Sequence, residues 1–282
     1  MSKEDLILIT DIGRKYVIGA ETIHALKSVT LTIKKGEFVA LMGPSGSGKS
    51  TLMNILGCLD TPTKGEYILN GINVSEMSDS ELAEVRNQEI GFVFQTFNLL
   101  PRSSAKDNVA LPLVYAGVKK EDRDTRAIKT LENVGLGNRL DHKPNELSGG
   151  QRQRVFVAQG LAQGGDILLL DEPFSALDVL TSETLRNEVI DLYTRERSPV
   201  KTILMVTHSI NEGLFMATRL VVMGAHPGSI RAVIDNPLPY PRDEHAPPRA
   251  CDHDEGQRLS RRRSRREVAC ASSGTRSGPR QA

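Results

Sequence analysis

Residues 43–51 have the sequence GPSGSGKST, a glycine-rich stretch between an apolar, β-prone run at 37–42 and a run at 52–56 without Gly or Pro. The spacing of its glycines, Lys49 and Ser50 fits G-x-x-x-x-G-K-[ST], a phosphate-binding loop between a strand and a helix. Small residues let backbone N–H groups turn toward a phosphate, and Lys49 can reach the β- and γ-phosphates of a nucleotide. Ser50 supplies a hydroxyl for Mg²⁺. An ordinary Gly/Ser turn is the alternative, but the coincidence of strand, glycines, lysine and serine favours a nucleotide site.

The composition limits the size and partners of the protein. With 282 residues, 39% of them hydrophobic, the chain can bury one sizeable core with an inserted subdomain. Its net charge of +1 gives the whole molecule no bias toward nucleic acid or membranes. The sequence has no run of about 18 apolar residues and no signal-peptide pattern at its start, so we expect a cytoplasmic chain that meets a membrane only through a partner. The three cysteines lack metal-ligand spacing, and Cys58 is expected to be a buried small hydrophobe in or just after the helix that follows the loop.

The residues on either side of the loop predict the layout of strands and helices. Alternating apolar and polar residues from 6 to 33, broken at Gly13 and Gly19, indicate short antiparallel strands before the loop. After the loop, residues 65–71 predict a strand closed by an Asn-Gly turn. A capping box at 78–81 opens a helix to about Arg86. Helix-period segments between 99 and 147 then indicate a helical insertion between strands.

Polar side chains follow three apolar strand candidates at the point where each strand ends. Gln95 follows the run 90–94, Asp171 and Glu172 follow the run 166–170, and His208 follows the run 202–206. The carboxyl ends of parallel strands form the ligand crevice of an α/β sheet. Asp171 can complete the shell of a Mg²⁺ ion, and Glu172 can take a proton from an attacking water. The alternatives are an acid pair satisfied by loop N–H groups or arginines, and a purely structural histidine.

Two further features are candidates for ligand contacts. LSGGQ at 147–151 precedes an arginine-rich helical segment and forms a second anion site at a helix start, although a plain helix entry would look similar. Tyr16 could stack on a purine ring, and packing of the tyrosine on the sheet face is the alternative.

Taken in order, these motifs resemble the nucleotide-binding subunit of ATP-binding cassette (ABC) transporters across about residues 7–242. The resemblance rests on GPSGSGKST, Gln95, LSGGQ, ILLLDEP at 167–173, SALD at 175–178 and His208; LSGGQ is the family's own signature and is lacking in other phosphate-loop enzymes. It implies an α/β fold, a P-loop NTPase (RecA-like) core with an N-terminal antiparallel β subdomain and an inserted α-helical subdomain at about 96–163. The ATP-binding domain is expected to span residues 1–242.

The resemblance also implies a Mg²⁺-dependent ATPase that acts as a head-to-tail dimer, with each ATP between the phosphate loop of one copy and the signature of the other. Glu172 is then the general base, His208 holds the γ-phosphate and the attacking water, and Gln95 senses Mg²⁺ and water. The expected metal ligands are Ser50, Gln95 and Asp171. Tyr16 would stack on adenine and Asp178 would link the two sites. The residues expected to bind the nucleotide are Tyr16, Gly43, Pro44, Ser45, Gly46, Ser47, Gly48, Lys49, Ser50, Thr51, Ser148, Gly149, Gly150, Gln151 and Asp178.

A membrane permease is the partner that the resemblance implies. The chain would lie at the cytoplasmic face of the inner membrane as a peripheral subunit, with the helical insertion and the segment after Gln95 passing motion to the permease. A periplasmic protein would join through the permease, and no specific nucleic acid is expected. A soluble ABC protein of ribosomes or DNA is the alternative from another class, but those proteins usually carry two cassettes or a long coiled coil, and this chain has neither.

The two halves of the chain resemble different transporter groups. Residues 57–63, 94–101 and 108–113 look like the lipoprotein-releasing and macrolide-export group, whereas residues 206–210, 222–228 and 236–239 look like the nitrate, sulfonate and taurine import group. The permease-facing surface lies mainly in the front half, which favours the export or lipoprotein-release type. The transported substrate is not encoded here, since specificity resides in the permease or a binding protein.

Two stretches depart from the family pattern. Ala158-Gln159-Gly160 stands where the family usually has Ala-Arg-Ala, and a helix-interior Gly costs about 1 kcal/mol relative to Ala, so we expect a less stable helix there. Residues 243–282 form an Arg-rich tail that is expected to be disordered. Its basic run at 261–266 could touch anionic lipid or nucleic acid, but a solvated tail, or an end unrelated to the family, is favoured.

Overall fold

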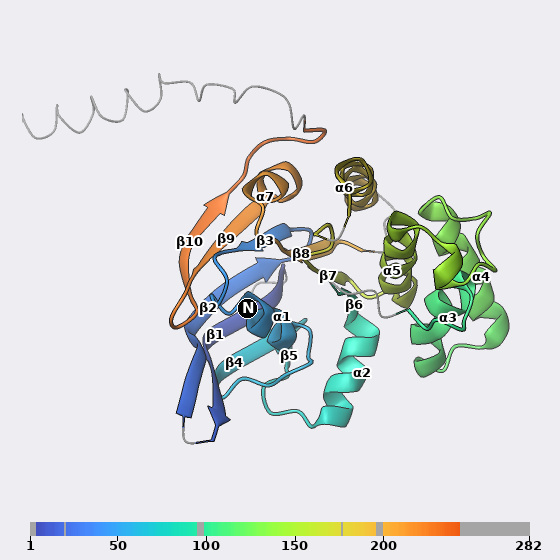
Figure 1. Ribbon diagram of the computed structural model, residues 1–282. Coiled ribbons are helices and arrows are strands. Elements are labelled where there is room, and N and C mark those ends of the chain that lie inside the picture. Colours follow the sequence, from blue (N-terminus) through green and yellow to red (C-terminus); the bar gives the residue numbers. More distant parts are fainter. Residues whose placement is uncertain (1–3, 20, 95–98, 176, 196–199, 243–282) are drawn as a thin grey trace, which may run out of the picture. The chain divides into compact units, whose positions relative to one another are not determined.

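The computed structural model describes residues 4–19, 21–94, 99–175, 177–195 and 200–242. Within this part the chain forms two β-sheets and seven α-helices (Figure 1). The predicted disorder of the tail at 243–282 concerns residues outside this description.

The larger sheet has six strands in the order β10-β9-β3-β8-β7-β6. Its members are β3 (Phe38–Met42), β6 (Ile90–Val93), β7 (Ile167–Asp171), β8 (Thr202–Val206), β9 (Arg219–Gly224) and β10 (Ser229–Asp235). All neighbouring pairs are parallel except β9 with β10. Strands β3, β7 and β8 are buried almost throughout, as expected of apolar strands covered on both faces.

The smaller sheet is antiparallel, with the order β2-β1-β4-β5. It consists of β1 (Asp5–Ile18), β2 (Glu21–Lys34), β4 (Lys64–Leu69) and β5 (Ile72–Asn73). The predicted antiparallel pairing and the break at Gly19 are confirmed, since Gly19 lies between β1 and β2. The predicted shortness of the strands and the break at Gly13 were wrong, because β1 and β2 are each 14 residues long. Gly13 lies inside β1 and pairs with Lys64, and irregular register on both sides of it lets the strand bend without ending.

The seven helices are α1 (Lys49–Leu56), α2 (Asp79–Glu89), α3 (Ala105–Tyr115), α4 (Lys120–Asn133), α5 (Gly149–Gln163), α6 (Val179–Thr194) and α7 (Ile210–Met216), with a short 3₁₀ turn at Pro144–Glu146. The capping box before α2 is confirmed, since Ser78 N–H donates to Glu81 Oε2 at 2.8 Å, but the helix continues past the predicted end at Arg86 to Glu89.

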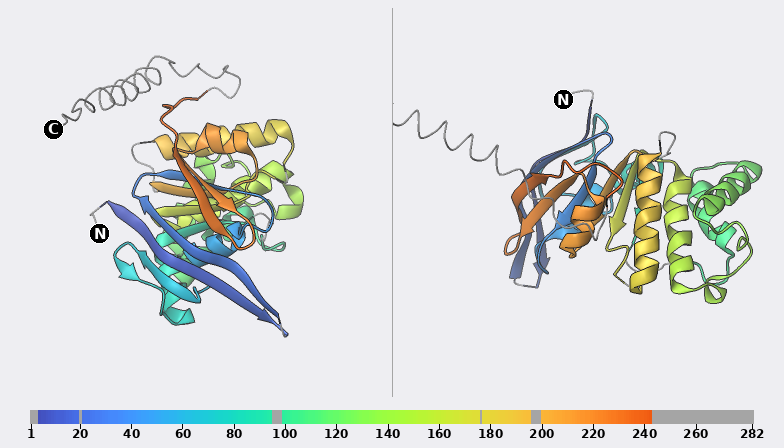
Figure 2. Two further views of the ribbon diagram at one scale, coloured as in Figure 1. Left: turned by 90° about the vertical axis from the view of Figure 1, so that its left-hand side faces the viewer. Right: turned by 90° about the horizontal axis from the view of Figure 1, so that it is seen from above.

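Two hydrophobic cores lie on opposite faces of the parallel sheet. Leu169 faces one core, together with α1 and the antiparallel sheet, while its neighbours Leu168 and Leu170 face the other, which is built with helices α3 to α7. Helices α5 and α6 run side by side over the second face, and α3 and α4 lie beyond α5 (Figures 1 and 2). Cys58, which follows the Gly57 C-cap of α1, is buried as predicted. The layers confirm the predicted P-loop core with an antiparallel β region and a helical insertion.

Candidate functional site

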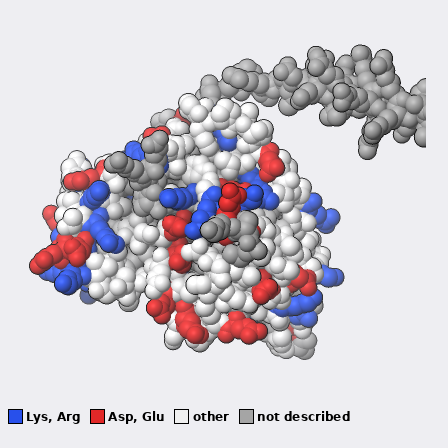
Figure 3. Space-filling view, turned by 180° about the vertical axis from the view of Figure 1, so that it is seen from behind, with Lys and Arg blue, Asp and Glu red and all other residues white. Residues whose placement is uncertain are grey.

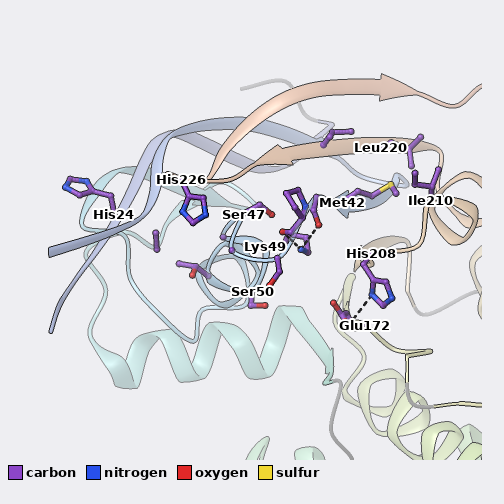
Figure 4. Close-up of a pocket in the computed structure, with 18 of the residues that line it drawn as sticks. His24, Met42, Ser47, Lys49, Ser50, Glu172, His208, Ile210, Leu220 and His226 are labelled. Carbon is purple, nitrogen blue, oxygen red and sulfur yellow. Dashed lines mark hydrogen bonds and ion pairs between the residues drawn. The ribbon is translucent and has the colours of Figure 1, made fainter. Parts of the chain in front are cut away.

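A cavity of about 1040 Å³ surrounds the loop that follows β3 (Figure 4). Its wall includes the phosphate loop, Glu172 directly after β7 and His208 shortly after β8. These strands are parallel neighbours, so their carboxyl ends bring residues distant in the sequence to one edge of the sheet. The structure therefore brings together the phosphate loop and two of the three predicted catalytic residues. The third, Gln95, lies outside the described residues.

The backbone of the phosphate loop at Gly48 packs so closely on neighbouring backbone that a side chain there would clash. Gly48 has a φ of 80°, and a Cβ placed on it would lie 2.8 Å from the Ala25 carbonyl oxygen. Gly48 is also the N-cap of α1 and provides no side-chain cap, so the N–H groups of the first turn remain available to an anion. The sequence motif thus becomes a helix N-terminus that opens into the cavity.

Two polar groups inside the loop are held in an arrangement that suits an anionic ligand. The Lys49 side chain is largely buried, and its Nζ donates to the carbonyl oxygens of Gly43 at 2.8 Å and Pro44 at 3.0 Å. The Ser47 hydroxyl is fully buried and has no hydrogen-bond partner among the described residues. A buried unsatisfied hydroxyl is costly in a packed protein, and a phosphate oxygen would supply its partner.

Asp171, the last residue of β7, and Glu172, the residue after it, differ in their surroundings. Burial, followed by the neighbouring charge of Glu172, raises the pKa of the Asp171 carboxyl, and Lys49 partly offsets this shift. A divalent cation at Asp171 would favour the ionised carboxylate, so the site suits Mg²⁺ electrostatically. Among the described residues there is no cluster of three or more His, Cys, Asp or Glu side chains that could hold a metal alone. A Mg²⁺ bound here would take most of its ligands from hydroxyls, waters and nucleotide phosphates.

Glu172 and His208 face each other at one end of the cavity. Glu172 Oε2 lies 3.5 Å from His208 Nδ1. Glu172 is held in the left-handed region, with a φ of 43°, and its N–H donates to the Val206 carbonyl oxygen at 3.0 Å. Such conformations cost about 1–3 kcal/mol and cluster at active sites.

A hydrogen-bonded turn positions His208 at the end of β8. The Thr207 hydroxyl donates to the Glu212 carboxylate, and the N–H of Ser209 donates back to the Thr207 hydroxyl at 3.0 Å. Ser209 in turn caps α7 by accepting from the Glu212 N–H at 3.3 Å. These bonds fix the backbone on both sides of His208.

Ser148, Gly150 and Gln151 of the LSGGQ stretch line a separate, smaller cavity of about 300 Å³ between the first turns of α5 and α6. Ser148 and Gln151 close a capping box, with the Ser148 N–H donating to Gln151 Oε1 at 3.0 Å. Among the described residues, this cavity and the phosphate-loop cavity have no lining residue in common. Within one copy, the structure does not bring the two predicted anion sites together.

Asp178 caps α6 in this structure. Its carboxylate accepts from the Thr181 N–H at 3.0 Å and from the Thr181 hydroxyl at 2.7 Å, and these bonds lower the pKa of Asp178. The cap gives Asp178 a local structural role, and its predicted part in linking two sites remains a prediction.

Tyr16 lies on β1 and is not among the residues that line the cavity. Its hydroxyl donates to Asp60 Oδ2 at 2.9 Å, and the Arg14 guanidinium, itself 2.7 Å from Asp60 Oδ1, lies 4.8 Å from the centre of the tyrosine ring. The ring is thus oriented by two neighbours, and adenine stacking on it stays a prediction.

The cavity also contains two histidines that sequence reasoning missed, His24 on β2 and His226 after β9. His226 lies in the stretch 222–228 that resembles the import group, but the sequence assigned neither histidine to the site, because their approach to the loop depends on long-range strand pairing.

None of the helices in the described ranges is both long and apolar enough to cross a membrane.

Comparisons with known proteins identify the family. Residues 26–175 match the family model described as "ABC transporter". The chain is 51% identical over 203 residues to the uncharacterized ABC transporter ATP-binding protein YknY of Bacillus subtilis, covering 72% of this chain and 86% of that protein. It is 49% identical over 208 residues to the macrolide export ATP-binding/permease protein MacB of Marinobacter nauticus, which covers 74% of this chain but only 32% of MacB.

A solved structure extends the likeness to the fold. The ATP-binding cassette MJ0796, described in a dimeric post-hydrolysis state bound to ADP and Pi, superposes with a TM-score of 0.73 at 41% identity, over 82% of this chain and 98% of that one. The family match, the extent of the similarity and the phosphate-loop cavity agree. The chain therefore belongs to the ABC transporter family, as an ATP-binding and ATP-hydrolysing subunit.

Proposed function

We propose that two copies of this chain form a head-to-tail dimer that hydrolyses Mg-ATP and powers a membrane permease of the lipoprotein-release or macrolide-export type. The separation of the phosphate-loop cavity from the LSGGQ cavity carries the proposal. The second anion site lies apart from the first within one copy. A second copy of the chain could bring its own LSGGQ site to the γ-phosphate of ATP bound at the phosphate loop. The dimeric state described for MJ0796 supports the same arrangement.

The steps of the chemistry are assigned to residues of the cavity, to residues beside it and to a second copy. The N–H groups of the loop and Lys49 bind the β- and γ-phosphates, and Ser148, Gly149 and Gly150 of a second copy complete the γ-phosphate site. Glu172 takes the proton of the attacking water, and His208, 3.5 Å away, orients the γ-phosphate and that water. Mg²⁺, held by Ser50, Asp171 and Gln95, would neutralise charge on the phosphate oxygens.

The helical insertion offers a docking surface for the permease. A groove of about 820 Å³ lies between α2, β6, α3 and α5, with the rings of Phe92, Phe94 and Phe156 in its wall and the exposed Tyr115 at its edge. We assign this groove to a cytoplasmic segment of the permease. Gln159 lines it, so the departure from the family's arginine removes a cation from the docking surface as well as from the helix.

The relatives support the export type, and the one face seen in Figure 3 gives no support for a nucleic-acid surface among its described residues. Two relatives named as macrolide export proteins are 49% and 50% identical to this chain over the matched residues. On the face seen in Figure 3, acidic and basic side chains of the described residues are interspersed, without the extended basic surface that nucleic acid would require. The location proposed is the cytoplasmic face of the membrane, where the permease holds the subunit.

Glu172→Gln tests the assigned mechanism. We expect ATP binding to survive and turnover to fall by about 10²–10⁴, the scale of a lost general base, with the ATP-bound dimer accumulating in size-exclusion chromatography with light scattering. Glu121→Gln, an exposed substitution on α4, is the matched control and should leave turnover unchanged. Unaltered turnover in Glu172→Gln would exclude Glu172 as the base.

Co-purification of the chain from its native membranes tests the partner. An exporter-type permease supports the proposal. Recovery of a permease of the nitrate, sulfonate or taurine import group would overturn the proposed export direction. It would favour the import type that the back half of the sequence resembles. Recovery of ribosomes or nucleic acid without a permease would place the chain in the soluble class instead.

A further inference from the structure

The turn between β9 and β10 lies against the phosphate loop. We propose that His226, in this turn, is a further nucleotide-contacting residue, which binds the phosphate chain of ATP from the rim of the loop opposite to His208. This inference rests on the proposed ATP site and adds to it a residue outside the motifs that define the family.

Backbone pairing with β2 fixes the turn in place. The Gly228 N–H donates to the Ala25 carbonyl oxygen at 3.1 Å, and the Lys27 N–H donates to the Gly228 carbonyl oxygen at 2.9 Å. Gly228 also touches the loop directly, because a Cβ built on it would lie 2.5 Å from the carbonyl oxygen of Ser47. The turn is thus in backbone contact with both β2 and the phosphate loop. These contacts fix the position of His226 relative to the phosphate loop.

The imidazole of His226 reaches the edge of the cradle. A Cβ built on Gly46 would lie 3.7 Å from His226 Cε1 and 3.9 Å from Nε2, and both residues line the cavity. Figure 4 shows the rings of His226 and His208 on opposite sides of Lys49. The ring therefore lies beside the part of the loop whose backbone N–H groups turn toward phosphates.

The backbone conformation of His226 adds a second observation. Its φ is 58°, in the left-handed region, where non-glycine side chains are uncommon although histidine tolerates it better than most. The side chain is exposed, so packing does not account for the conformation. Residues held in this region cluster at ligand sites, which agrees with a ring that is aimed at a ligand.

The chemistry of an imidazole suits a phosphate and this location. An N–H of the ring can donate to a phosphate oxygen, which makes a charge-assisted hydrogen bond. The contact lies at Gly46, inside the phosphate loop, so it should concern the phosphates that ATP and ADP share rather than the base or ribose. His226 would then complement Lys49 from the other side of the polyphosphate.

Three variants of the full-length chain test the contact by calorimetric titration with ATP, ADP and AMP in the presence of Mg²⁺. His226→Gly removes the ring while glycine accepts the left-handed backbone, and His226→Asn accepts the same backbone and keeps an N–H donor. We expect His226→Gly to weaken ATP and ADP binding about tenfold, as for one hydrogen bond to a charged group, with AMP binding changed less than twofold. His226→Asn should recover part of the loss. His142→Asn, in the helical insertion and outside the cavity lining, is the matched control and should bind as the unaltered chain does.

Each other outcome overturns the proposal. The proposed contact would be refuted if His226→Gly bound ATP and ADP within twofold of the unaltered chain at an unchanged melting temperature. An equal loss for AMP would assign the ring to the nucleoside. Normal ATP binding combined with loss of the ATP-bound dimer in a Glu172→Gln background would assign it to the second copy. Lys49→Ala separates this result from the proposed function itself, because full ATP affinity in Lys49→Ala would refute the ATP site as a whole.

Discussion

A methyl group added at Gly91 should separate the helical layer from the sheet. Gly91 lies on β6, and a Cβ built on it would be 2.4 Å from the carbonyl oxygen of Gly160 on α5 and 2.9 Å from its carbonyl carbon. Ordinary contact needs about 1 Å more, and a helix backbone cannot yield as a flexible side chain does. Overpacking of this kind typically costs about 1–3 kcal/mol, and we expect Gly91→Ala to reach the upper value because backbone is involved.

Thermal unfolding without nucleotide measures this effect, since bound nucleotide would add its own stabilisation. For a domain of this size, about 3 kcal/mol corresponds to a drop of about 6–12 °C in melting temperature. Gly160→Ala is the matched control on the opposite face of the contact. Its Cβ would meet Leu168 Cδ1 at 3.0 Å and Val93 Cγ2 at 3.4 Å, with the Phe92 backbone nitrogen at an ordinary 3.6 Å. Strain of about 1 kcal/mol should therefore offset the helix-propensity gain of about 1 kcal/mol.

We therefore expect the unaltered chain and Gly160→Ala to have the same melting temperature, and Gly91→Ala to melt well below both. A Gly91→Ala variant that melts with the unaltered chain would refute the proposed backbone contact. If Gly160→Ala is more stable by the full helix-propensity difference of about 1 kcal/mol, Leu168 must move aside without cost. That result would support the expectation from the sequence that Gly160 destabilises its helix.

Two further predictions concern groups near the site. Asp171→Asn should raise the melting temperature of the nucleotide-free chain at pH 7, because a carboxyl with a raised folded-state pKa penalises the folded state above that pKa. The advantage should shrink as the pH falls through the raised pKa toward the ordinary aspartate pKa of 3.8, and the extra stabilisation by Mg-ATP should be lost. Arg242→Ala should lower the free energy of unfolding by about 2 kcal/mol, because Arg242 Nη1 donates to the carbonyl oxygens of Leu214 at 2.9 Å and Ala217 at 2.7 Å at the end of α7. Urea unfolding measures the latter, and Arg242→Lys should resemble Ala because a lysine cannot reproduce the planar fork.

Sequence reasoning succeeded where the decisive interactions are local. The phosphate loop, the apolar strand before Asp171 and the capping box at Ser78 depend on residues within a few positions of each other. The coarse fold followed from these elements in their order, because parallel strands with polar carboxyl ends leave few arrangements. Gln95 and the tail lie outside the described residues, and the roles given to Tyr16 and Asp178 remain predictions.

Sequence reasoning failed where distant segments decide the outcome. Asp11 and Ser28 both adopt a φ of 52°, and with the irregular pairing around them they let β1 pass through Gly13, which looked like a break. The stability effect of Gly160 could not be judged from helix propensity, since it depends on Leu168 and on Gly91. His226 acquires its place through the pairing of β9 with β10 and of their turn with β2, so its position is a property of the assembled sheets.

Helix α5 connects the surface proposed to meet the γ-phosphate of a second copy with the groove proposed to hold the permease. Ser148 caps its start, and Gly160, about 18 Å farther along the axis, meets Gly91 beside the groove assigned to the permease. A displacement of about 1 Å forced at Gly160 would be carried along a continuous helix to Ser148, and a misplacement of that size at a reacting site can cost about 10²-fold in rate. Gly91→Ala should therefore reduce ATP turnover at temperatures where the variant is still folded, while its affinity for ATP at the phosphate loop stays unchanged. Such a separation of turnover from affinity would show that the contact between the two glycines sets the position of the signature as well as the stability of the fold.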